Sequence, residues 1–210
     1  MKFILPKIYP ITDRTLSELT HEEQTVRLID GGASLIQLRD KTASSRSFYE
    51  DALMSVRAAK NTGVRVVIND RIDIALMTGA DGVHIGQDDL PPDAARNLLA
   101  PDAIVGFSTH SAEQARLAVN RWTLDYIAIG PIFPTDTKYD AETLVGLDIL
   151  HEARLAVGNV PLIAIGGINS SNLMSVFAAG ADSAAVISEL YQGYDIAETY
   201  RGLTNIATAV

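Results

Sequence analysis

The sequence predicts a single-domain α/β protein with a parallel TIM (β/α)8 barrel, on three observations. Eight short apolar runs alternate with helix-like stretches along the 210 residues. Three of the runs follow the same Gly-Ala phrase, at Gly32-Ala33, Gly79-Ala80 and Gly180-Ala181. A glycine just past a helix adopts the left-handed conformation without steric cost, so the phrase is typical of a helix-to-strand connection. Continuously apolar strands that alternate with helices are typical of parallel sheets covered on both faces.

The expected strands follow one another at regular intervals along the chain. They lie within 7–12, 32–37, 65–68, 79–84, 104–107, 126–129, 162–165 and 180–188. Helices are expected between them, where apolar residues recur at three- and four-residue spacing, as at Phe48, Ala52, Val56 and Ala59. Eight such units favour a closed barrel. A doubly wound open sheet remains the alternative, because periodicity does not show closure.

Composition narrows the class of protein. The chain is 47% hydrophobic, has a net charge of -9 and contains no cysteine. We expect one domain over residues 1–210, with neither nucleic acid nor an anionic membrane as its main partner. The lack of cysteine excludes disulfides, thiolate metal sites and cysteine nucleophiles. The apolar start of the chain is too short for a signal peptide, and no run approaches the ~18 residues of a membrane span, so a cytoplasmic protein is expected.

Polar residues gather where the apolar runs end, which is where barrel enzymes carry their chemistry. After the second strand, the two-residue period places Gln37, Arg39 and Lys41 on one face. Two cations and an amide directed at one spot suit a diphosphate. Two solvated basic residues in a loop are the alternative interpretation.

Carboxylates follow the third and fourth strands. Asp70 ends the third, and Asp88 and Asp89 follow the fourth. Carboxylates at the ends of adjacent parallel strands can share a Mg²⁺ ion, which takes few protein ligands and leaves room for phosphate oxygens. The candidate pair is Asp70 with Asp89. Helix capping is the alternative role, for Asp70 before Arg71 and for Asp88 or Asp89 before Pro91.

The fifth and sixth strands are followed by hydroxyl side chains, one histidine and a lysine. Ser108 and Lys138 are candidates for phosphate binding, although Ser108 could equally cap the next helix and Lys138 could be an exposed loop residue. A Ser-x-His pair at Ser108 and His110, with no placed acid, is weak support for a nucleophilic triad. His84 in the fourth strand is expected to be a hydrogen-bonded barrel residue rather than a catalyst.

The last two strands predict a phosphate site. Gly166-Gly167 follows the seventh, and Ile187-Ser188 follows the eighth. Glycine lets backbone N–H groups approach an anion, and helix N-termini point toward the same place. A structural role for the two glycines in a tight turn is the alternative.

These motifs together resemble the thiamine-phosphate synthase family over nearly the whole chain. They are Tyr9-Pro10-Ile11-Thr12-Asp13, Gln37-Leu38-Arg39-Asp40-Lys41, Val67-Ile68-Asn69-Asp70-Arg71, Gly82-Val83-His84-Ile85-Gly86-Gln87-Asp88-Asp89, Gly130-Pro131-Ile132-Phe133-Pro134-Thr135-Asp136-Thr137-Lys138 and Ile165-Gly166-Gly167-Ile168. The stretch from Tyr139 to Gly146 departs from the family, in which this segment is usually shorter. The resemblance implies that a pyrimidine diphosphate and a thiazole phosphate condense to thiamine phosphate and pyrophosphate.

The resemblance also implies a division of the site. Its pyrimidine diphosphate side would be Gln37, Leu38, Arg39, Asp40, Lys41, Asn69, Ser108 and Lys138. Its thiazole phosphate side would be Thr135, Asp136, Thr137, Gly167, Ile187 and Ser188. Asp70 and Asp89 would bind Mg²⁺ as cofactor. Catalysis would fall to Arg39, Lys41, Ser108 and Lys138, which stabilise the departing pyrophosphate.

Three other functions remain open at this point. A thiazole tautomerase would share the barrel and the thiazole phosphate site, with His110 as the residue to question. A non-catalytic module could bind thiazole phosphate or thiamine phosphate for regulation. A barrel isomerase for another phosphorylated metabolite is compatible with the fold and the phosphate anchor alone.

Overall fold

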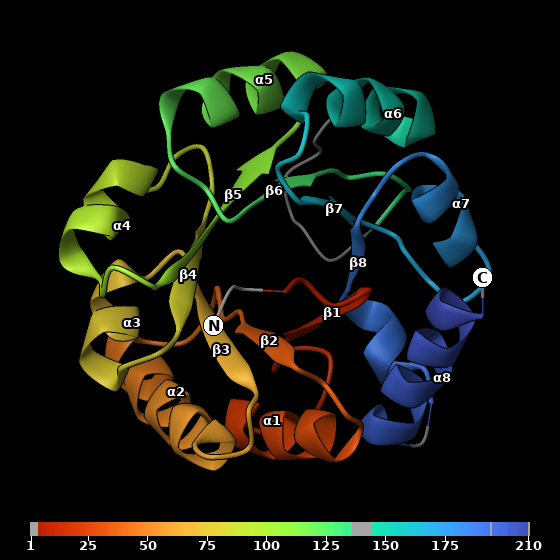
Figure 1. The fold of residues 1–210 in the computed structure, drawn as a ribbon. Helices are drawn as coiled ribbons and strands as arrows, with labels where there is room; N and C mark the ends of the chain where they lie inside the picture. Colours follow the sequence, from red (N-terminus) through yellow and green to blue (C-terminus); the bar gives the residue numbers. More distant parts are fainter. Residues whose placement is uncertain (1–3, 136–143, 194, 210) are drawn as a thin grey trace.

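The computed structural model is a closed barrel of parallel strands surrounded by helices (Figure 1). It describes residues 4–135, 144–193 and 195–209. The strands pair in chain order and β8 pairs back onto β1, so the barrel prediction is confirmed and the open-sheet alternative is wrong. The strands are β1 (Ile8–Thr12), β2 (Leu35–Leu38), β3 (Arg65–Asn69), β4 (Gly82–Ile85), β5 (Ile104–Thr109), β6 (Tyr126–Ile129), β7 (Leu162–Ile165) and β8 (Ser183–Val186).

A helix follows each strand and lies outside the barrel (Figure 1). The helices are α1 (His21–Asp30), α2 (Ser45–Ala59), α3 (Ile72–Thr78), α4 (Pro92–Leu98), α5 (Ala112–Arg121), α6 (Gly146–Val157), α7 (Leu173–Ala178) and α8 (Ile196–Thr208). A short 3-10 helix, η1 (Ser188–Tyr191), sits between β8 and α8. Among the described residues, no helix is both long enough and apolar enough to cross a membrane.

Side chains of each strand alternate between two apolar layers. In β2, Ile36 and Leu38 join the layer between strands and helices, whereas Leu35 joins the layer inside the barrel. The inner layer also contains the large aromatic residues Tyr9 and Tyr126. Because alternation is fixed by the strand, it also decides which side chains at the strand ends can reach a site at the barrel mouth.

Two of the Gly-Ala phrases continue with an aspartate, as Gly79-Ala80-Asp81 and Gly180-Ala181-Asp182, and these Gly-Ala-Asp phrases have a structural role at the amino ends of the strands. The Asp81 carboxylate accepts a hydrogen bond from the N–H of Val66 at 2.8 Å, and the Asp81 N–H donates to the Val66 carbonyl at 2.8 Å. Asp182 makes the same two bonds with Leu162, each at 2.8 Å. Each aspartate thus satisfies backbone groups where a strand begins and fixes the register of neighbouring strands.

Gly106 makes room for a phenol inside the barrel. It lies opposite Tyr126 in the β5–β6 pair, and a Cβ at this position would stand 2.0 Å from Tyr126 Cζ. Any other residue would therefore push the buried Tyr126 ring out of place.

We predict that Gly106→Ala lowers the free energy of unfolding by about 1–3 kcal/mol, because the added methyl overpacks the barrel interior. Gly202→Ala is the control: Gly202 lies within α8, and a Cβ there would have no atom within 4 Å. That change should be neutral or stabilise by up to about 1 kcal/mol. Urea unfolding of both variants measures the difference, and equal stability would contradict the packing described for Tyr126.

Candidate active site

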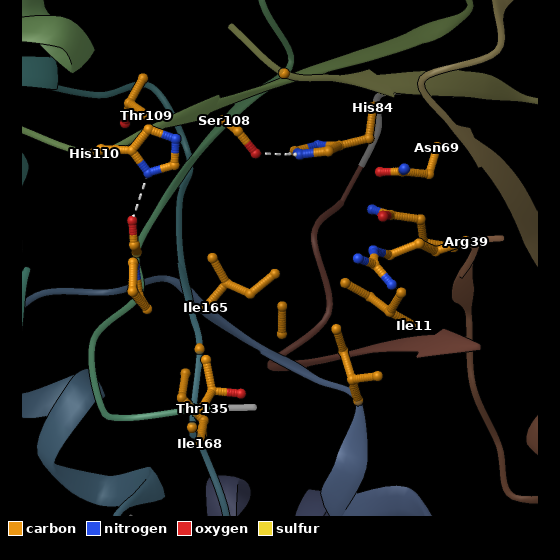
Figure 2. A pocket seen from close by; sticks show the side chains of 18 of the residues that line it. Ile11, Arg39, Asn69, His84, Ser108, Thr109, His110, Thr135, Ile165 and Ile168 are labelled. Atoms are coloured by element: carbon orange, nitrogen blue, oxygen red, sulfur yellow. Dashed lines mark hydrogen bonds between the residues drawn. The ribbon is translucent and has the colours of Figure 1, made fainter. Parts of the chain in front are cut away.

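A cavity of about 830 Å³ opens at the carboxyl ends of the strands. Arg39 and Asn69 lie on one side of it, and Thr135 and Ile168 lie on the opposite side (Figure 2). The sequence-predicted residues that line it are Gln37, Arg39, Lys41, Asn69, Asp70, Asp89, Ser108, Thr135, Gly167, Ile187 and Ser188. Asp136, Thr137 and Lys138 lie outside the described residues, as do residues 139–143 of the loop that departs from the family pattern.

Two predicted residues do not line the cavity. Leu38 is fully buried in the outer apolar layer, because Gln37 and Arg39 take the inner face of β2 and its extension. Asp40 turns back into its own loop, where its carboxylate accepts hydrogen bonds from the N–H groups of Thr42 and Ala43. The side chains of Leu38 and Asp40, which the resemblance placed on the pyrimidine diphosphate side, therefore point away from the cavity.

Arg39 is fixed by a buried carboxylate. Its Nη1 atom lies 3.1 Å from Asp13 Oδ2, and the side chains are 15% and 7% exposed, respectively. Asp13 Oδ1 accepts hydrogen bonds from the backbone and the hydroxyl of Thr15. The Asp13 N–H donates to the Tyr191 hydroxyl at 2.8 Å. Since Tyr191 belongs to the 3-10 helix that starts at Ser188, this network joins the two sides of the cavity.

Asp70 and Asp89 face the cavity and do not cap helices. The residues that precede α3 and α4 are Arg71 and Pro91, and neither helix has a side-chain cap. Asp88 lines the cavity as well, so the capping alternatives are wrong for Asp70 and are not supported for Asp88 or Asp89.

The environment of the two carboxylates favours a cation. Asp70 has a φ of 62°, a conformation that residues other than glycine rarely adopt, and its carboxylate pairs with the Lys41 ammonium. Asp89 Oδ2 accepts a hydrogen bond from the Gly86 N–H at 2.7 Å. Burial raises the pKa of the Asp89 carboxyl, and the nearby Asp70 carboxylate raises it further, because two adjacent negative charges repel.

This donor set fits Mg²⁺. Within the described ranges, no group of three or more histidine, cysteine or acidic side chains is arranged to hold a metal ion. Mg²⁺ does not need such a cage, because it is usually held by one or two carboxylates together with phosphate oxygens and water. Asp70 and Asp89 offer two carboxylates beside an open cavity.

Ser108 is tied to His84 rather than to a helix. The cap of α5 is Ser111, which accepts from the Gln114 N–H, so the capping alternative for Ser108 is wrong. Ser108 Oγ lies 2.7 Å from His84 Nε2 (Figure 2). His84 Nδ1 lies 3.0 Å from the Tyr126 hydroxyl. His84 is 5% exposed, which confirms it as a hydrogen-bonded barrel residue.

The hydrogen-bonded chain continues below the cavity. The Tyr126 hydroxyl lies 3.1 Å from the Tyr9 hydroxyl, and Gln37 Nε2 donates to the Tyr9 hydroxyl at 3.1 Å. Burial raises the pKa of both phenols far enough that each keeps its proton at neutral pH.

The opposite side of the cavity offers backbone donors. Gly166 and Gly167 have φ angles of 98° and 63°, and a Cβ on Gly167 would stand 2.5 Å from the Pro134 carbonyl oxygen. Both the turn and the close packing therefore require glycine. The structural role in a tight turn, given above as the alternative interpretation of these glycines, is thus present. Within the described part of the chain, the N–H groups of Gly166 and Gly167 have no hydrogen-bond acceptor. Such N–H groups, with Ser188 at the start of the 3-10 helix, form a concave site suited to phosphate.

The barrel and its cavity define a class of protein: a (β/α)8 enzyme for phosphorylated small molecules. The cavity combines cations and paired carboxylates on one side with glycine N–H groups on the other. Such phosphate sites after the last two strands recur in barrel enzymes.

Comparison with known proteins identifies the family. The family described as thiamine monophosphate synthase matches residues 8–190, and the chain belongs to it. A thiamine-phosphate synthase of Syntrophomonas wolfei is 44% identical over 200 residues, which cover 95% of each chain. One of Methanocella arvoryzae is 43% identical over 200 residues, covering 95% of this chain and 93% of the relative. These relatives are transferases by the reaction that their name describes.

Solved structures agree with the sequence comparisons. Thiamine phosphate pyrophosphorylase from Pyrococcus furiosus superposes with a TM-score of 0.85 at 34% identity, over 97% of this chain and 96% of the other. A 3-hexulose-6-phosphate synthase superposes with a TM-score of 0.65 at 17% identity, over 95% of this chain and 99% of the other. The second likeness is one of fold alone.

Three residues of the site were missed by sequence reasoning. Asp13, which holds Arg39, directly follows β1, so its place at a strand end was an available signal. Tyr9 and Tyr126 lie below the cavity, inside the barrel. Their pairing carries no local signal, because the two residues are 117 positions apart in the chain.

His21 supports the loop that carries Arg39 and Lys41. Its Nδ1 lies 2.6 Å from Thr12 Oγ1, and its Nε2 lies 3.5 Å from Asp40 Oδ2. The ring has no solvent exposure. Burial lowers the pKa of His21 below its usual value, although the carboxylates of Asp51 and Asp40 oppose this effect.

We predict that the free energy of unfolding falls as the pH drops below about 6.5, the ordinary pKa of histidine. The unfolded chain binds a proton there that the buried His21 does not, so stability is full above the unfolded pKa and is lost as the pH falls toward the lower folded pKa. One such group contributes a slope of up to about 1.4 kcal/mol per pH unit. Urea unfolding between pH 7.5 and pH 5.5 measures it.

Two variants assign the slope to this residue. His21→Asn retains a donor and an acceptor near Thr12 and should flatten the slope. His151→Gln, on the exposed face of α6, should leave it unchanged. A His21→Asn protein with the wild-type slope would show that other groups cause the acid sensitivity.

Proposed function

We propose that this protein condenses 4-amino-2-methyl-5-(diphosphooxymethyl)pyrimidine with 4-methyl-5-(2-phosphooxyethyl)thiazole, giving thiamine phosphate and pyrophosphate. The family and the names of the relatives support this reaction. One observation carries it to this chain: a single cavity has two differently built anion-binding sides. A reaction that joins a diphosphate ester to a monophosphate ester needs both.

The chemistry of each side suggests its substrate. Arg39, Lys41 and Ser108 line the side with the carboxylates, which suits a diphosphate and its metal ion. Gly167 and Ser188 line the other side, which suits a single phosphate. In this assignment Asn69 joins the diphosphate side, Thr135 and Ile187 join the monophosphate side, and Gln37 orients the pyrimidine.

The proposed mechanism follows the movement of charge. The carbon–oxygen bond to the diphosphate breaks, and its electron pair leaves with the diphosphate. The thiazole nitrogen then forms a new bond to the same carbon. The electron-rich aminopyrimidine carries the positive charge that develops, so no protein nucleophile is required.

In this mechanism the residues of the protein stabilise the diphosphate leaving group and hold the phosphate of the thiazole. Arg39 and Lys41 stabilise the negative charge that grows on the leaving group, each by roughly 2–4 kcal/mol, the range of preorganised charge-stabilising donors. The Gly167 and Ser188 region holds the thiazole phosphate so that the ring nitrogen faces the reacting carbon. Asp70 and Asp89 would hold Mg²⁺, which when bound supplies further positive charge to the diphosphate oxygens. Lys138, outside the described residues, is expected to add a third cation.

The alternative activities use less of this cavity. A thiazole tautomerase would use His110, whose Nδ1 donates to the Gly130 carbonyl at 2.7 Å at the cavity wall (Figure 2). A regulatory module would need only the phosphate anchor. Neither requires the paired carboxylates Asp70 and Asp89 or the buried Asp13 that holds Arg39.

The direct experiment incubates the purified protein with both substrates and Mg²⁺ and measures thiamine phosphate and pyrophosphate. Formation of both products in equal amounts, abolished by EDTA and restored by excess Mg²⁺, is expected. If neither product forms while the folded protein binds thiazole phosphate, the tautomerase or the binding module replaces the proposed synthase.

We predict that Asp70→Asn weakens the apparent affinity for Mg²⁺ in turnover by about tenfold or more, because loss of a metal ligand should cost at least as much as loss of a supporting residue. Asp73→Asn is the matched control, since Asp73 is an exposed acid on α3 that pairs with Arg71. Rates measured across a Mg²⁺ titration separate the two variants. Normal turnover of Asp70→Asn at limiting Mg²⁺ would remove Asp70 from the metal site.

A further inference from the structure

A continuous chain of hydrogen bonds, buried except at its Ser108 end, runs under the cavity from Gln37 to Ser108. Its members, in order, are Gln37, Tyr9, Tyr126, His84 and Ser108. Successive polar atoms lie 3.1, 3.1, 3.0 and 2.7 Å apart. The first four residues are at most 5% exposed, at 2%, 1%, 0% and 5% respectively, so water does not compete along this part of the hydrogen-bonded chain.

With Gln37 Nε2 as the first donor, the protons of this hydrogen-bonded chain follow one order. Gln37 Nε2 donates to Tyr9. Among the described residues, the only further partner of the Tyr9 hydroxyl is Tyr126, so Tyr9 must donate to Tyr126 if its proton is to be bonded. Tyr126 then accepts from Tyr9 and, in the same order, donates its own proton to His84.

The same donor-to-acceptor order continues through His84 to Ser108 at the cavity. When His84 Nδ1 accepts from Tyr126, the proton of the neutral ring lies on Nε2. His84 Nε2 then donates to Ser108 Oγ, and the Ser108 hydroxyl proton is left for a ligand in the cavity. At the other end, the Gln37 amide nitrogen donates to Tyr9, and the amide oxygen is left to accept from a ligand.

We propose that this chain couples the two ends of one substrate and makes the site select an amino group over a keto group on the pyrimidine. The inference rests on the proposed function, which puts the diphosphate at Ser108 and the pyrimidine at Gln37. A diphosphate oxygen only accepts hydrogen bonds, so a bound diphosphate requires Ser108 to donate. That requirement fixes the order of every proton back to Gln37, whose oxygen then accepts from the exocyclic amine.

A 4-oxo pyrimidine needs a hydrogen-bond donor at Gln37, whereas the 4-amino compound needs an acceptor there. Its carbonyl oxygen needs a donor, so the Gln37 amide would have to turn over and present Nε2 to the ligand. The amide oxygen would then face the Tyr9 hydroxyl, which could donate to it only if the proton order of the whole chain reversed. The reversed order would make Ser108 donate to His84 and leave the diphosphate without a hydrogen bond. Tyr9, Tyr126 and His84 are therefore positioning residues for specificity.

The experiment measures substrate affinity by calorimetry in the absence of the thiazole. The ligands are the 4-amino pyrimidine diphosphate and its 4-oxo analogue, each with Mg²⁺. We expect the wild-type protein to bind the amino compound roughly 100-fold more tightly or better, since a site with a fixed hydrogen-bond pattern rejects the mismatched analogue. In Tyr126→Phe and Tyr9→Phe, the amide of Gln37 is free to turn, and the ratio should fall about tenfold.

Tyr200→Phe is the matched control. Tyr200 is a buried tyrosine of α8 whose hydroxyl donates to the Ile8 carbonyl at 3.3 Å, away from the cavity. This variant should keep the wild-type ratio, and thermal unfolding shows which variants are folded. An unchanged ratio in either folded Tyr9 or Tyr126 variant would overturn the proposal, as would an equal loss in Tyr200→Phe.

Product formation by the wild-type protein separates this inference from the proposed function. A protein that shows the expected affinity ratios without making thiamine phosphate would refute the synthase reaction and retain the selection mechanism. A protein that makes thiamine phosphate, with ratios that do not respond to Tyr9 or Tyr126, would retain the reaction and refute the selection mechanism.

Discussion

Closure of eight parallel strands is the constraint on which the site depends. It brings every carboxyl end to one rim, so Arg39 after β2, Asp70 after β3 and Ser108 in β5 meet around one cavity although they are far apart in the chain. The two-residue period of each strand then decides which side chains enter. Apolar layers inside and outside the barrel hold this arrangement in register, and the aspartates of the Gly-Ala-Asp phrases fix the opposite ends of the strands.

The ion pairs at the cavity also follow from the meeting of the strand ends at one rim. In a chain of net charge -9, the two cations that line the described part of the cavity are each held by a carboxylate, Arg39 by Asp13 and Lys41 by Asp70. Arg39 is 15% exposed and fixed, whereas Lys41 is 51% exposed and has room to move when a ligand arrives. A rigid cation and an adjustable one suit a leaving group whose charge increases during the reaction.

Much of this arrangement was predictable from the sequence, because strand alternation and strand-end position are local signals. They predicted the barrel, the shared face of Gln37 and Arg39, and the glycine turn at Gly167. Side-chain direction was not predictable where the resemblance gave only a motif: Leu38 and Asp40 were placed on the diphosphate side, and neither residue lines the cavity. The hydrogen-bonded chain from Gln37 through Tyr126 to Ser108 was missed, since it joins residues from five strands that only closure brings together.

The most direct test of the two-sided cavity is a crystal structure of the protein with thiamine phosphate, pyrophosphate and Mg²⁺. The account predicts pyrophosphate and the metal ion beside Arg39, Asp70 and Asp89, and the phosphate of thiamine phosphate beside Gly167 and Ser188. Thiamine phosphate bound in the opposite orientation, or pyrophosphate bound away from the carboxylates, would contradict it.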